Sequence, residues 1–105
     1  MQLGPDFSKY EQFVEDKWME PAIDCPTELY LAVAITGEAG ELANVVKKSY
    51  REGDCAITPK VLDELGDILY YMTKLANYMG FTLADLQTRN MTKLEARYPR
   101  KQNEN

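Results

Sequence analysis

The chain has 105 residues, a formal net charge of −5 and no histidine. This length fits one domain with a modest core, which a partner subunit would help to stabilise. The negative charge argues against general nucleic-acid binding, which needs a basic surface. The lack of histidine excludes His-ligated zinc and the Ser-His and Cys-His nucleophile systems, so any chemistry must use carboxylates, lysines, arginines, hydroxyls or a hard metal ion.

The N-terminal segment lacks the basic-then-apolar pattern of a signal sequence. The longest apolar run, Leu29 to Ile35, is too short to cross a membrane. We therefore expect a cytoplasmic protein with no membrane contact. Cys25 and Cys55 show no metal-binding or redox spacing, and we interpret both as free thiols.

A helical period dominates the sequence from end to end, and strand-like alternation is absent. The first predicted helix covers about residues 6–19 and ends before Pro21. The second covers about residues 27–52, with Thr27 as its N-cap and Gly53 after its last turn.

The third predicted helix opens at the Thr58-Pro59 pair, a cap followed by proline, and ends at Gly80. The fourth opens with a capping box of Thr82 and Asp85 and stops at Pro99. Short connections between four amphipathic helices predict antiparallel neighbours. We expect one all-α, four-helix bundle-like domain over residues 1–99, followed by a flexible tail over residues 100–105.

Two glutamates interrupt the apolar stripe of the second predicted helix. The stripe begins with Leu31, Ala34 and Ile35, and Leu42, Val45 and Tyr50 are its later members. Its i, i+3, i+4 progression passes through Glu38 and Glu41 in the middle. Side chains three residues apart on a helix differ in direction by only about 60°. The two carboxylates can therefore converge on one point.

The third predicted helix repeats this arrangement with Glu64 and Asp67 at the margin of its apolar side. The residues predicted to form that buried side are Val61, Leu65, Ile68, Leu69, Met72, Leu75 and Met79. Glycines accompany both acidic pairs, at Gly37, Gly40 and Gly66. Each costs roughly 1 kcal/mol relative to alanine inside a helix, and such glycines usually mark a close approach to the backbone. In an antiparallel hairpin the two acidic pairs can face each other.

Two simpler explanations compete with a metal site. A single Glu-x-x-Glu pattern on a helix is more often a solvated surface, and acids on helices often form ion pairs. However, no position three or four residues after these acids is basic, and only Lys60 offers a local partner. Four carboxylates gathered near a core need a compensating cation. All-oxygen ligands favour Mg²⁺, with Mn²⁺ as a possible substitute.

Carboxylate-held Mg²⁺ in turn suggests phosphate chemistry, because this ion keeps positions open for substrate oxygens. The bound cation also reverses the acidic field that would otherwise repel a polyphosphate.

The segments GEAGELANVVKK and DELGDILYYMTKLANYMGFTLADLQTRNMTKLEARYP resemble the MazG-like all-α nucleoside triphosphate pyrophosphohydrolases. The resemblance covers about residues 27–99. The family pattern is Glu-Glu-x-x-Glu on one helix and Glu-x-x-Asp on the next, and Gly37 stands here where the family has its leading glutamate.

The resemblance implies that Glu38, Glu41, Glu64 and Asp67 hold Mg²⁺. It implies water attack between the α and β phosphates of a (d)NTP, which yields a (d)NMP and pyrophosphate. It also implies a homodimer or homotetramer with the site close to the subunit contact.

Asn90 lies on the inner stripe of the fourth predicted helix, where spacing alone leaves a buried amide and a substrate contact equally open. The N-x-x-K pattern of the family matches Asn90 and Lys93 and implies substrate contact, with Lys93 as a point charge on phosphate oxygens. Arg97 is a further candidate, for which a solvated charge is the alternative. Trp18 is a candidate for stacking on the base, with a place in the core as its alternative.

The leading hypothesis is a Mg²⁺-dependent nucleotide pyrophosphohydrolase that cleanses or reshapes nucleotide pools, with Glu38 or Glu41 as the proton acceptor for the attacking water. One alternative is a non-catalytic helical interaction module. The other is a phosphoribosyl-ATP pyrophosphohydrolase-like activity on the same fold.

Overall fold

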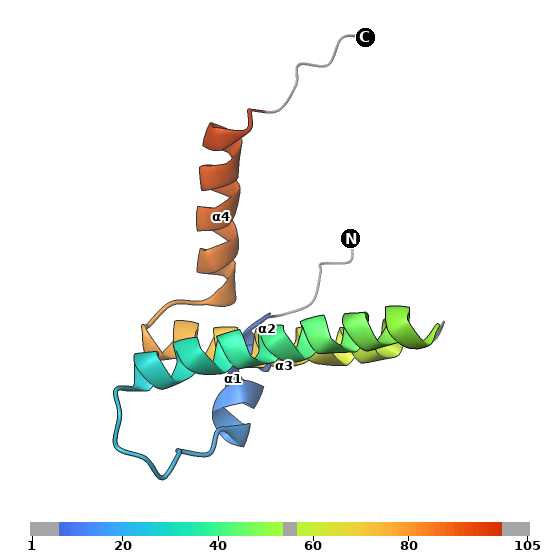
Figure 1. The fold of residues 1–105 in the computed structure, drawn as a ribbon. Coiled ribbons are helices and arrows are strands. Elements are labelled where there is room, and N and C mark those ends of the chain that lie inside the picture. Colours follow the sequence, from blue (N-terminus) through green and yellow to red (C-terminus); the bar gives the residue numbers. More distant parts are fainter. Residues whose placement is uncertain (1–6, 54–56, 100–105) are drawn as a thin grey trace, which may run out of the picture.

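Four α-helices make up most of the residues that the computed structural model describes, 7–53 and 57–99 (Figure 1). They are α1 (Phe7–Lys17), α2 (Thr27–Glu52), α3 (Ile57–Tyr78) and α4 (Leu83–Arg97). No strand occurs within these described ranges. The predicted all-α fold with four helices is confirmed. Cys55 and the segment 100–105 that was predicted to be a tail lie outside the described residues.

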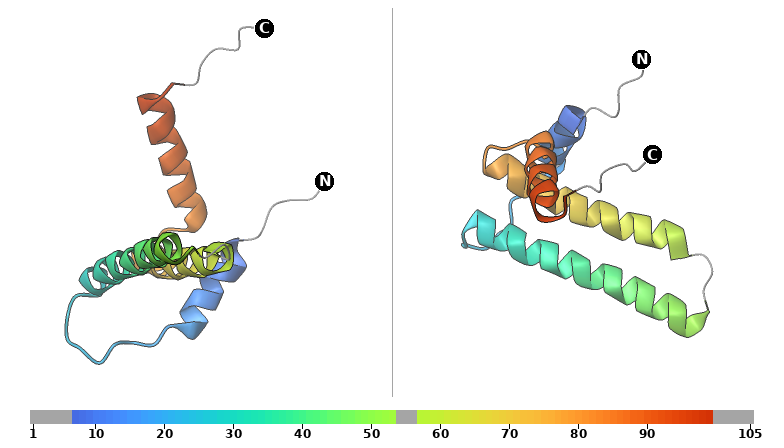
Figure 2. Two further views of the ribbon diagram at one scale, coloured as in Figure 1. Left: turned by 45° about the vertical axis from the view of Figure 1, so that its right-hand side comes forward. Right: turned by 90° about the horizontal axis from the view of Figure 1, so that it is seen from above.

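Helices α2 and α3 form a long antiparallel hairpin that provides most of the helix-to-helix contact in the molecule (Figure 2). Gly53 ends α2 in the left-handed conformation, with φ 65°, and its N–H donates to the Ser49 carbonyl. This confirms its predicted role as a helix C-terminal residue. The predicted N-cap role of Thr27 is wrong, because Thr27 is already the first helical residue and Pro26 occupies the cap position without a side-chain hydrogen bond.

The turn from α3 to α4 is fixed by local hydrogen bonds. Gly80 has φ 84°, and a Schellman motif forms because Gly80 N–H donates to Asn77 and Phe81 N–H donates to Ala76. Thr82 and Asp85 then form the predicted capping box at the start of α4. At the other end, α3 begins at Ile57, one residue before the predicted cap at Thr58.

Helix α4 leaves the hairpin at this turn and projects away from it (Figure 1). It contacts α1 and α3 and makes no helix contact with α2. Its base is anchored, since Leu83 is buried and the Leu83 N–H donates to Glu11 Oε2 of α1 at 2.6 Å. The antiparallel packing predicted for neighbouring helices therefore holds for α2 and α3 but not for α4, whose outer turns have no helix beside them.

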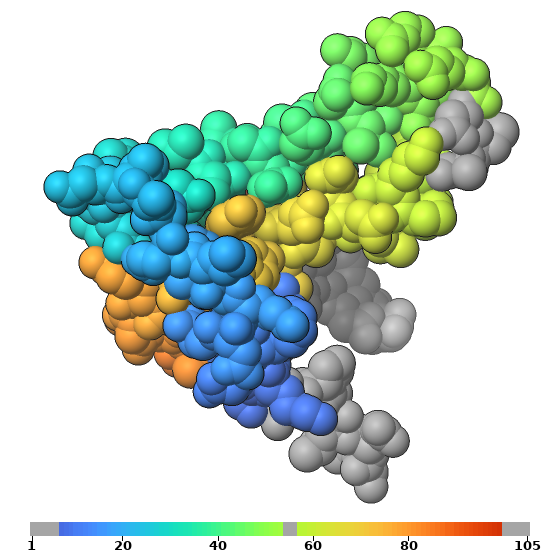
Figure 3. Space-filling model, turned by 90° about the horizontal axis from the view of Figure 1, so that it is seen from below, coloured from blue at the N-terminus to red at the C-terminus, as the bar shows by residue number. Residues whose placement is uncertain are grey.

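Helix α1 packs against the C-terminal half of α3, and the far end of the hairpin extends beyond it (Figure 3). The core is small. Val14 and Leu31 are fully buried, and Ala76 and Leu83 are nearly so. Several residues predicted to face the core are instead exposed, among them Tyr50 at 84%. The exposed apolar residues of the predicted α3 stripe are Leu65, Leu69 and Met79.

Candidate metal centre

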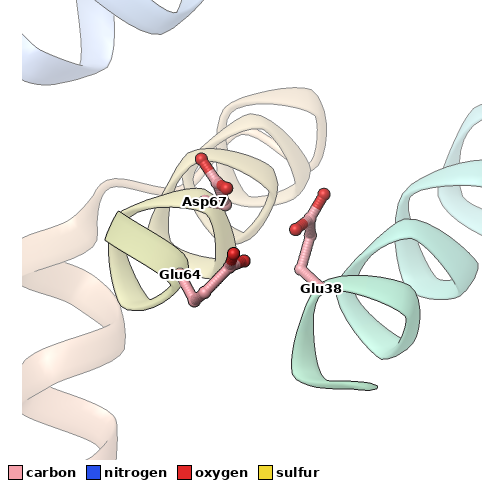
Figure 4. A group of neighbouring side chains, drawn as sticks. All are labelled: Glu38, Glu64 and Asp67. Carbon is pink, nitrogen blue, oxygen red and sulfur yellow. The ribbon is translucent and has the colours of Figure 1, made fainter. Parts of the chain in front are cut away.

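Three carboxylates from the two hairpin helices converge at the middle of the hairpin. Glu38 projects from α2, and Glu64 and Asp67 project from α3 toward it (Figure 4). One carboxylate oxygen from each residue lies within 4.8 Å of the others. The structure thus brings together three of the four residues that the sequence analysis assigned to Mg²⁺.

The helical period explains why these side chains meet. Glu64 and Asp67 are three residues apart and share one side of α3. The antiparallel pairing of α2 and α3 then places Glu38 opposite them. Each helix contributes its acids at the edge of the helix contact, so the group lies partly covered at the surface. Glu38 and Glu64 are half-buried, and Asp67 is exposed.

The environment disfavours the charged state of two of these groups. Burial raises the pKa of Glu38, and the charges of Asp67, Glu64 and Glu41 raise it further. Burial likewise raises the pKa of Glu64, together with the charges of Asp67, Glu41 and Asp63. Within residues 7–53 and 57–99, no hydrogen bond or ion pair compensates Glu38, Glu64 or Asp67.

The donor set fits a hard divalent cation, because it consists of carboxylate oxygens alone. Two oxygens bound to one Mg²⁺ at about 2.1 Å are at most about 4.2 Å apart. The observed limit of 4.8 Å is close to this separation, so small side-chain rotations would bring all three oxygens into range. Glu38, Glu64 and Asp67 are the residues that could hold the ion.

Glu41 does not belong to this close group. It is exposed on α2, one turn after Glu38. It is nonetheless near, because its charge contributes to the raised pKa of both Glu38 and Glu64. Its assignment as a metal ligand and as a proton acceptor stays a prediction.

The glycines beside the acids leave open space. A Cβ atom built on Gly37, Gly40 or Gly66 would meet no heavy atom within 4 Å. No other part of the described chain comes close to the helix backbone at these positions. The space that the glycines leave is accessible to a ligand from outside.

An aromatic cluster adjoins the acids. Trp18 lies in the connection after α1, and its ring centre is 6.2 to 6.3 Å from those of Tyr30, Tyr70 and Tyr71. Lys74 places its ammonium group 5.2 Å from the centre of the Trp18 ring. Trp18 is half-buried and packs in this aromatic cluster, and its role in stacking on a base stays a prediction.

Tyr71 connects the aromatic cluster to the acids. Burial raises its pKa, and the charges of Tyr30, Glu38, Tyr70 and Asp67 raise it further. The Tyr71 ring also contacts Trp18 and Tyr70 edge-on, with ring centres 6.3 and 5.3 Å apart. The roles of Tyr30 and Tyr70 in this cluster were missed from sequence. The signal was the Tyr70-Tyr71 pair, which follows Asp67 by one helical turn.

The α4 candidates are not part of this site within one protomer. Asn90, Lys93 and Arg97 are all exposed on a helix that has no contact with α2. None of their charges affects the pKa of Glu38 or Glu64. The alternative of a buried amide for Asn90 is wrong in the protomer, because the side chain is exposed. Substrate contact by these three residues stays a prediction.

Comparison with known proteins agrees with the helical arrangement. A model of the MazG nucleotide pyrophosphohydrolase domain matches residues 27–101, a stretch that includes all three acids of the close group. The Gene 37 protein of Mycobacterium phage L5 is 41% identical over 75 residues, which are 68% of this chain. The match spans 66% of that relative, just under two thirds of its length. No solved structure matches this chain. Because the domain model matches well over half of the chain and includes the convergent acids, the protein belongs to the MazG nucleotide pyrophosphohydrolase family.

Proposed function

We propose that the protein is a Mg²⁺-dependent pyrophosphohydrolase that cleaves a nucleoside triphosphate to the monophosphate and pyrophosphate. The observation that carries this proposal is the convergence of Glu38, Glu64 and Asp67 within 4.8 Å, with no compensating cation in the described chain. Membership of the MazG family supports the reaction class.

In this proposal, Glu38, Glu64 and Asp67 would hold the ion through their carboxylates. Mg²⁺ bound there would neutralise charge on the phosphates and lower the pKa of a nearby water. Glu41 lies beside the close group without belonging to it, and it accepts the proton of the attacking water. The open space at Gly37 and Gly40 admits the phosphate chain.

A panel of common NTPs and dNTPs with Mg²⁺ or Mn²⁺ tests the proposal, with product identification by chromatography. We expect monophosphate and pyrophosphate in equal amounts, and none in the presence of EDTA. Release of inorganic phosphate as the first product would contradict the proposed cleavage position. No turnover of any nucleotide by a folded protein would refute the enzyme. Phosphoribosyl-ATP belongs in the same panel, because a strong preference for it would favour the second activity considered for this fold.

We further propose that the protein acts as a homodimer. Large apolar side chains of the described residues are exposed where α3 ends and α4 begins, among them Met79 at 59% and Phe81 at 51%. A stable interface buries about 800 Å² of each partner. These exposed apolar side chains could contribute to such an interface.

An apolar groove at the turn between α3 and α4 is the proposed contact. It has a volume of about 460 Å³ and is lined by residues that include Met72, Met79, Phe81 and Leu86. In a dimer formed here, α4 can approach the acidic group of the partner. Asn90 and Lys93 would then reach substrate phosphates across the subunit boundary.

Light scattering on Leu86→Glu tests this contact, with Tyr50→Glu as a control at an exposed aromatic residue outside the groove. We expect the wild type and Tyr50→Glu to have the mass of two chains and Leu86→Glu that of one, with unchanged circular dichroism. A monomeric wild type would contradict the proposal. A partner that binds a monomeric wild-type groove would favour the interaction module instead.

Helix α2 also satisfies the length and composition of a membrane span, with a mean hydropathy of 1.2. Core helices of other proteins satisfy the same test. Glu38 and Glu41 lie near the middle of α2, and carboxylates at that depth in a bilayer cost about 2.5 to 3.5 kcal/mol each. We therefore propose that its apolar side chains serve packing against α3 and a second copy.

A further inference from the structure

A small pocket lies in the hairpin beyond the acidic group, toward the end of α2 and the start of α3. Its volume is about 210 Å³, and its lining residues are Val45, Lys48, Ser49, Glu52 and Lys60. Each helix thus contributes a lysine. Ser49 is buried and adds a hydroxyl group, which can donate a hydrogen bond. The carboxylate of Glu52 is contacted by Arg51 Nη2 at 3.4 Å, which offsets its charge.

Helical geometry places both lysines on the faces that carry the acids. Lys48 comes seven residues after Glu41, so the two side chains differ in direction around α2 by only about 20°. Lys60 comes four residues before Glu64, a difference of about 40° around α3. The rise along the helix is about 10 Å in the first case and about 6 Å in the second. The acidic group and the pocket therefore follow one another along the same side of the hairpin.

Helix dipoles explain only one of these two lysines. A cation near the C-terminal end of a helix is favoured, which accounts equally for Lys47, Lys48 and Arg51 at the end of α2. Lys60, however, lies in the first turn of α3, where the dipole disfavours a cation and favours an anion. An anion bound between Lys48 and Lys60 would be attracted by both ammonium groups and by this end of α3.

In the opposite direction along the hairpin, the lysine on the acid-bearing face of α3 is already paired. Lys74 comes seven residues after Asp67, and its ammonium group binds Glu15 Oε1 at 2.8 Å with only 12% of the side chain exposed. A triphosphate carries more negative charge than one Mg²⁺ ion neutralises. Cations on its phosphates also stabilise the charge of the transition state. The exposed Lys48 and Lys60 are therefore better placed than Lys74 to bind the phosphates that extend beyond the acids.

We propose that this pocket holds the β and γ phosphates of the substrate, with Lys48 and Lys60 as point charges on the phosphate oxygens. The inference rests on the proposed pyrophosphohydrolase and adds the site of its pyrophosphate product. One water is added across the bridge between the α and β phosphates, so that the β and γ phosphates leave this pocket together as pyrophosphate.

Inhibition by the two products tests this site. In the presence of Mg²⁺, we expect Lys48→Met and Lys60→Met each to raise the inhibition constant of pyrophosphate about tenfold and to leave that of the nucleoside monophosphate unchanged. Lys48→Arg keeps the charge and should restore most of the pyrophosphate affinity.

Lys47→Met is the matched control, because it removes the same charge from the neighbouring residue. Lys47 points about 180° away from Glu38 around α2, so its loss should change neither inhibition constant. Equal effects of Lys47→Met and Lys48→Met would show that only the overall charge at the end of α2 matters, and would overturn the inference. So would a Lys48→Met variant with unchanged pyrophosphate inhibition.

Calorimetric titration with pyrophosphate separates this inference from the proposed function, because it needs no turnover. We expect the wild type with Mg²⁺ to bind pyrophosphate and Lys48→Met to bind it about tenfold more weakly, with unchanged circular dichroism. Binding that depends on Lys48 and Lys60, without hydrolysis of any nucleotide, would refute the enzyme and retain the pocket. Hydrolysis with equal pyrophosphate affinity in the wild type, Lys48→Met and Lys60→Met would retain the enzyme and refute the pocket.

Discussion

Glu38 of α2 and Asp67 of α3 each bring a carboxylate oxygen to within 4.8 Å of the other, and neither has a basic partner in the described chain. Two like charges at such a separation repel each other, and partial burial weakens the solvent screening that would reduce the repulsion. The arrangement is favourable only when a cation neutralises it. The carboxylates repel each other without a metal ion and are stabilised by one. We therefore expect the stability of this site to depend steeply on the metal concentration.

Removing one carboxylate of the close group should weaken metal binding and turnover together. We expect Glu64→Gln to lower the affinity for Mg²⁺ by at least tenfold and to lower kcat by at least a hundredfold. Asp63→Asn removes the same charge from the neighbouring α3 residue, which lies outside the close group. Calorimetric titration with Mg²⁺ and a turnover assay check both variants. Equal losses in the two variants would indicate a general effect of charge and contradict a specific ligand role for Glu64.

Glu41 tests whether the site needs an acid outside the close group. Glu41→Gln should abolish turnover with little change in the fold, because the Glu41 side chain is exposed and forms no hydrogen bond or ion pair within the described residues. If Glu41 accepts the proton of the attacking water, Mg²⁺ affinity should change much less than kcat. Kinetics and metal titration on the same preparation distinguish the two roles. A variant with near-normal turnover would remove Glu41 from the mechanism.

The raised pKa of Glu38 predicts how the metal-free protein responds to pH. Its pKa in the unfolded chain is near the ordinary value of 4.5, and burial with neighbouring charges raises its pKa in the folded state. Between these two values the folded state binds more protons than the unfolded state, so the free energy of unfolding decreases as the pH rises through this window. Above the raised pKa the full destabilisation is present.

Glu38→Gln should therefore be more stable than the wild type at pH 7 in EDTA, and this gain should disappear at pH values below the unfolded pKa. Mg²⁺ should reverse the order at pH 7 by stabilising the wild type alone. Urea denaturation in EDTA and in Mg²⁺ at both pH values measures the differences. A Glu38→Gln variant that is less stable than the wild type at pH 7 in EDTA would mean that the carboxylates do not repel each other as the geometry indicates.

The parts of the fold that depend on neighbouring residues could be predicted from the sequence. Gly53 after α2 and the capping box of Thr82 and Asp85 were predicted correctly, because backbone conformation and local hydrogen bonds determine them. Helical spacing also predicted that Glu38 would face the acids of α3. Spacing gives a direction around the helix but does not fix a side-chain rotamer, so it could not predict which of the four acids would form the close group.

Contacts between segments could not be predicted in this way. The period of α2 predicted an inner position near Tyr50, yet Tyr50 is 84% exposed, because no other described helix packs on α2 beside α3. The cluster around Trp18 joins the connection after α1 with α2 and α3, and no local pattern encodes such a meeting. The direction of α4 depends on the turn at Gly80 and on how few side chains hold its outer part.

Gly37 offers a test of the leading glutamate that is missing from the family pattern in this chain. A Cβ atom at this position meets no heavy atom within 4 Å, and the residue is exposed in the middle of α2. A side chain can therefore be added without steric cost, and replacing a helical glycine gains up to about 1 kcal/mol of stability. Gly37→Glu should raise the affinity for Mg²⁺ several-fold by restoring a carboxylate beside Glu38. Gly37→Gln has nearly the same shape without the charge, and it should gain the stability but not the affinity.

Thermal unfolding and Mg²⁺ titration of the two variants separate the effects. Equal Mg²⁺ affinities would show that position 37 lies outside the coordination sphere. Lower turnover in both variants would show instead that the phosphate chain needs the open space.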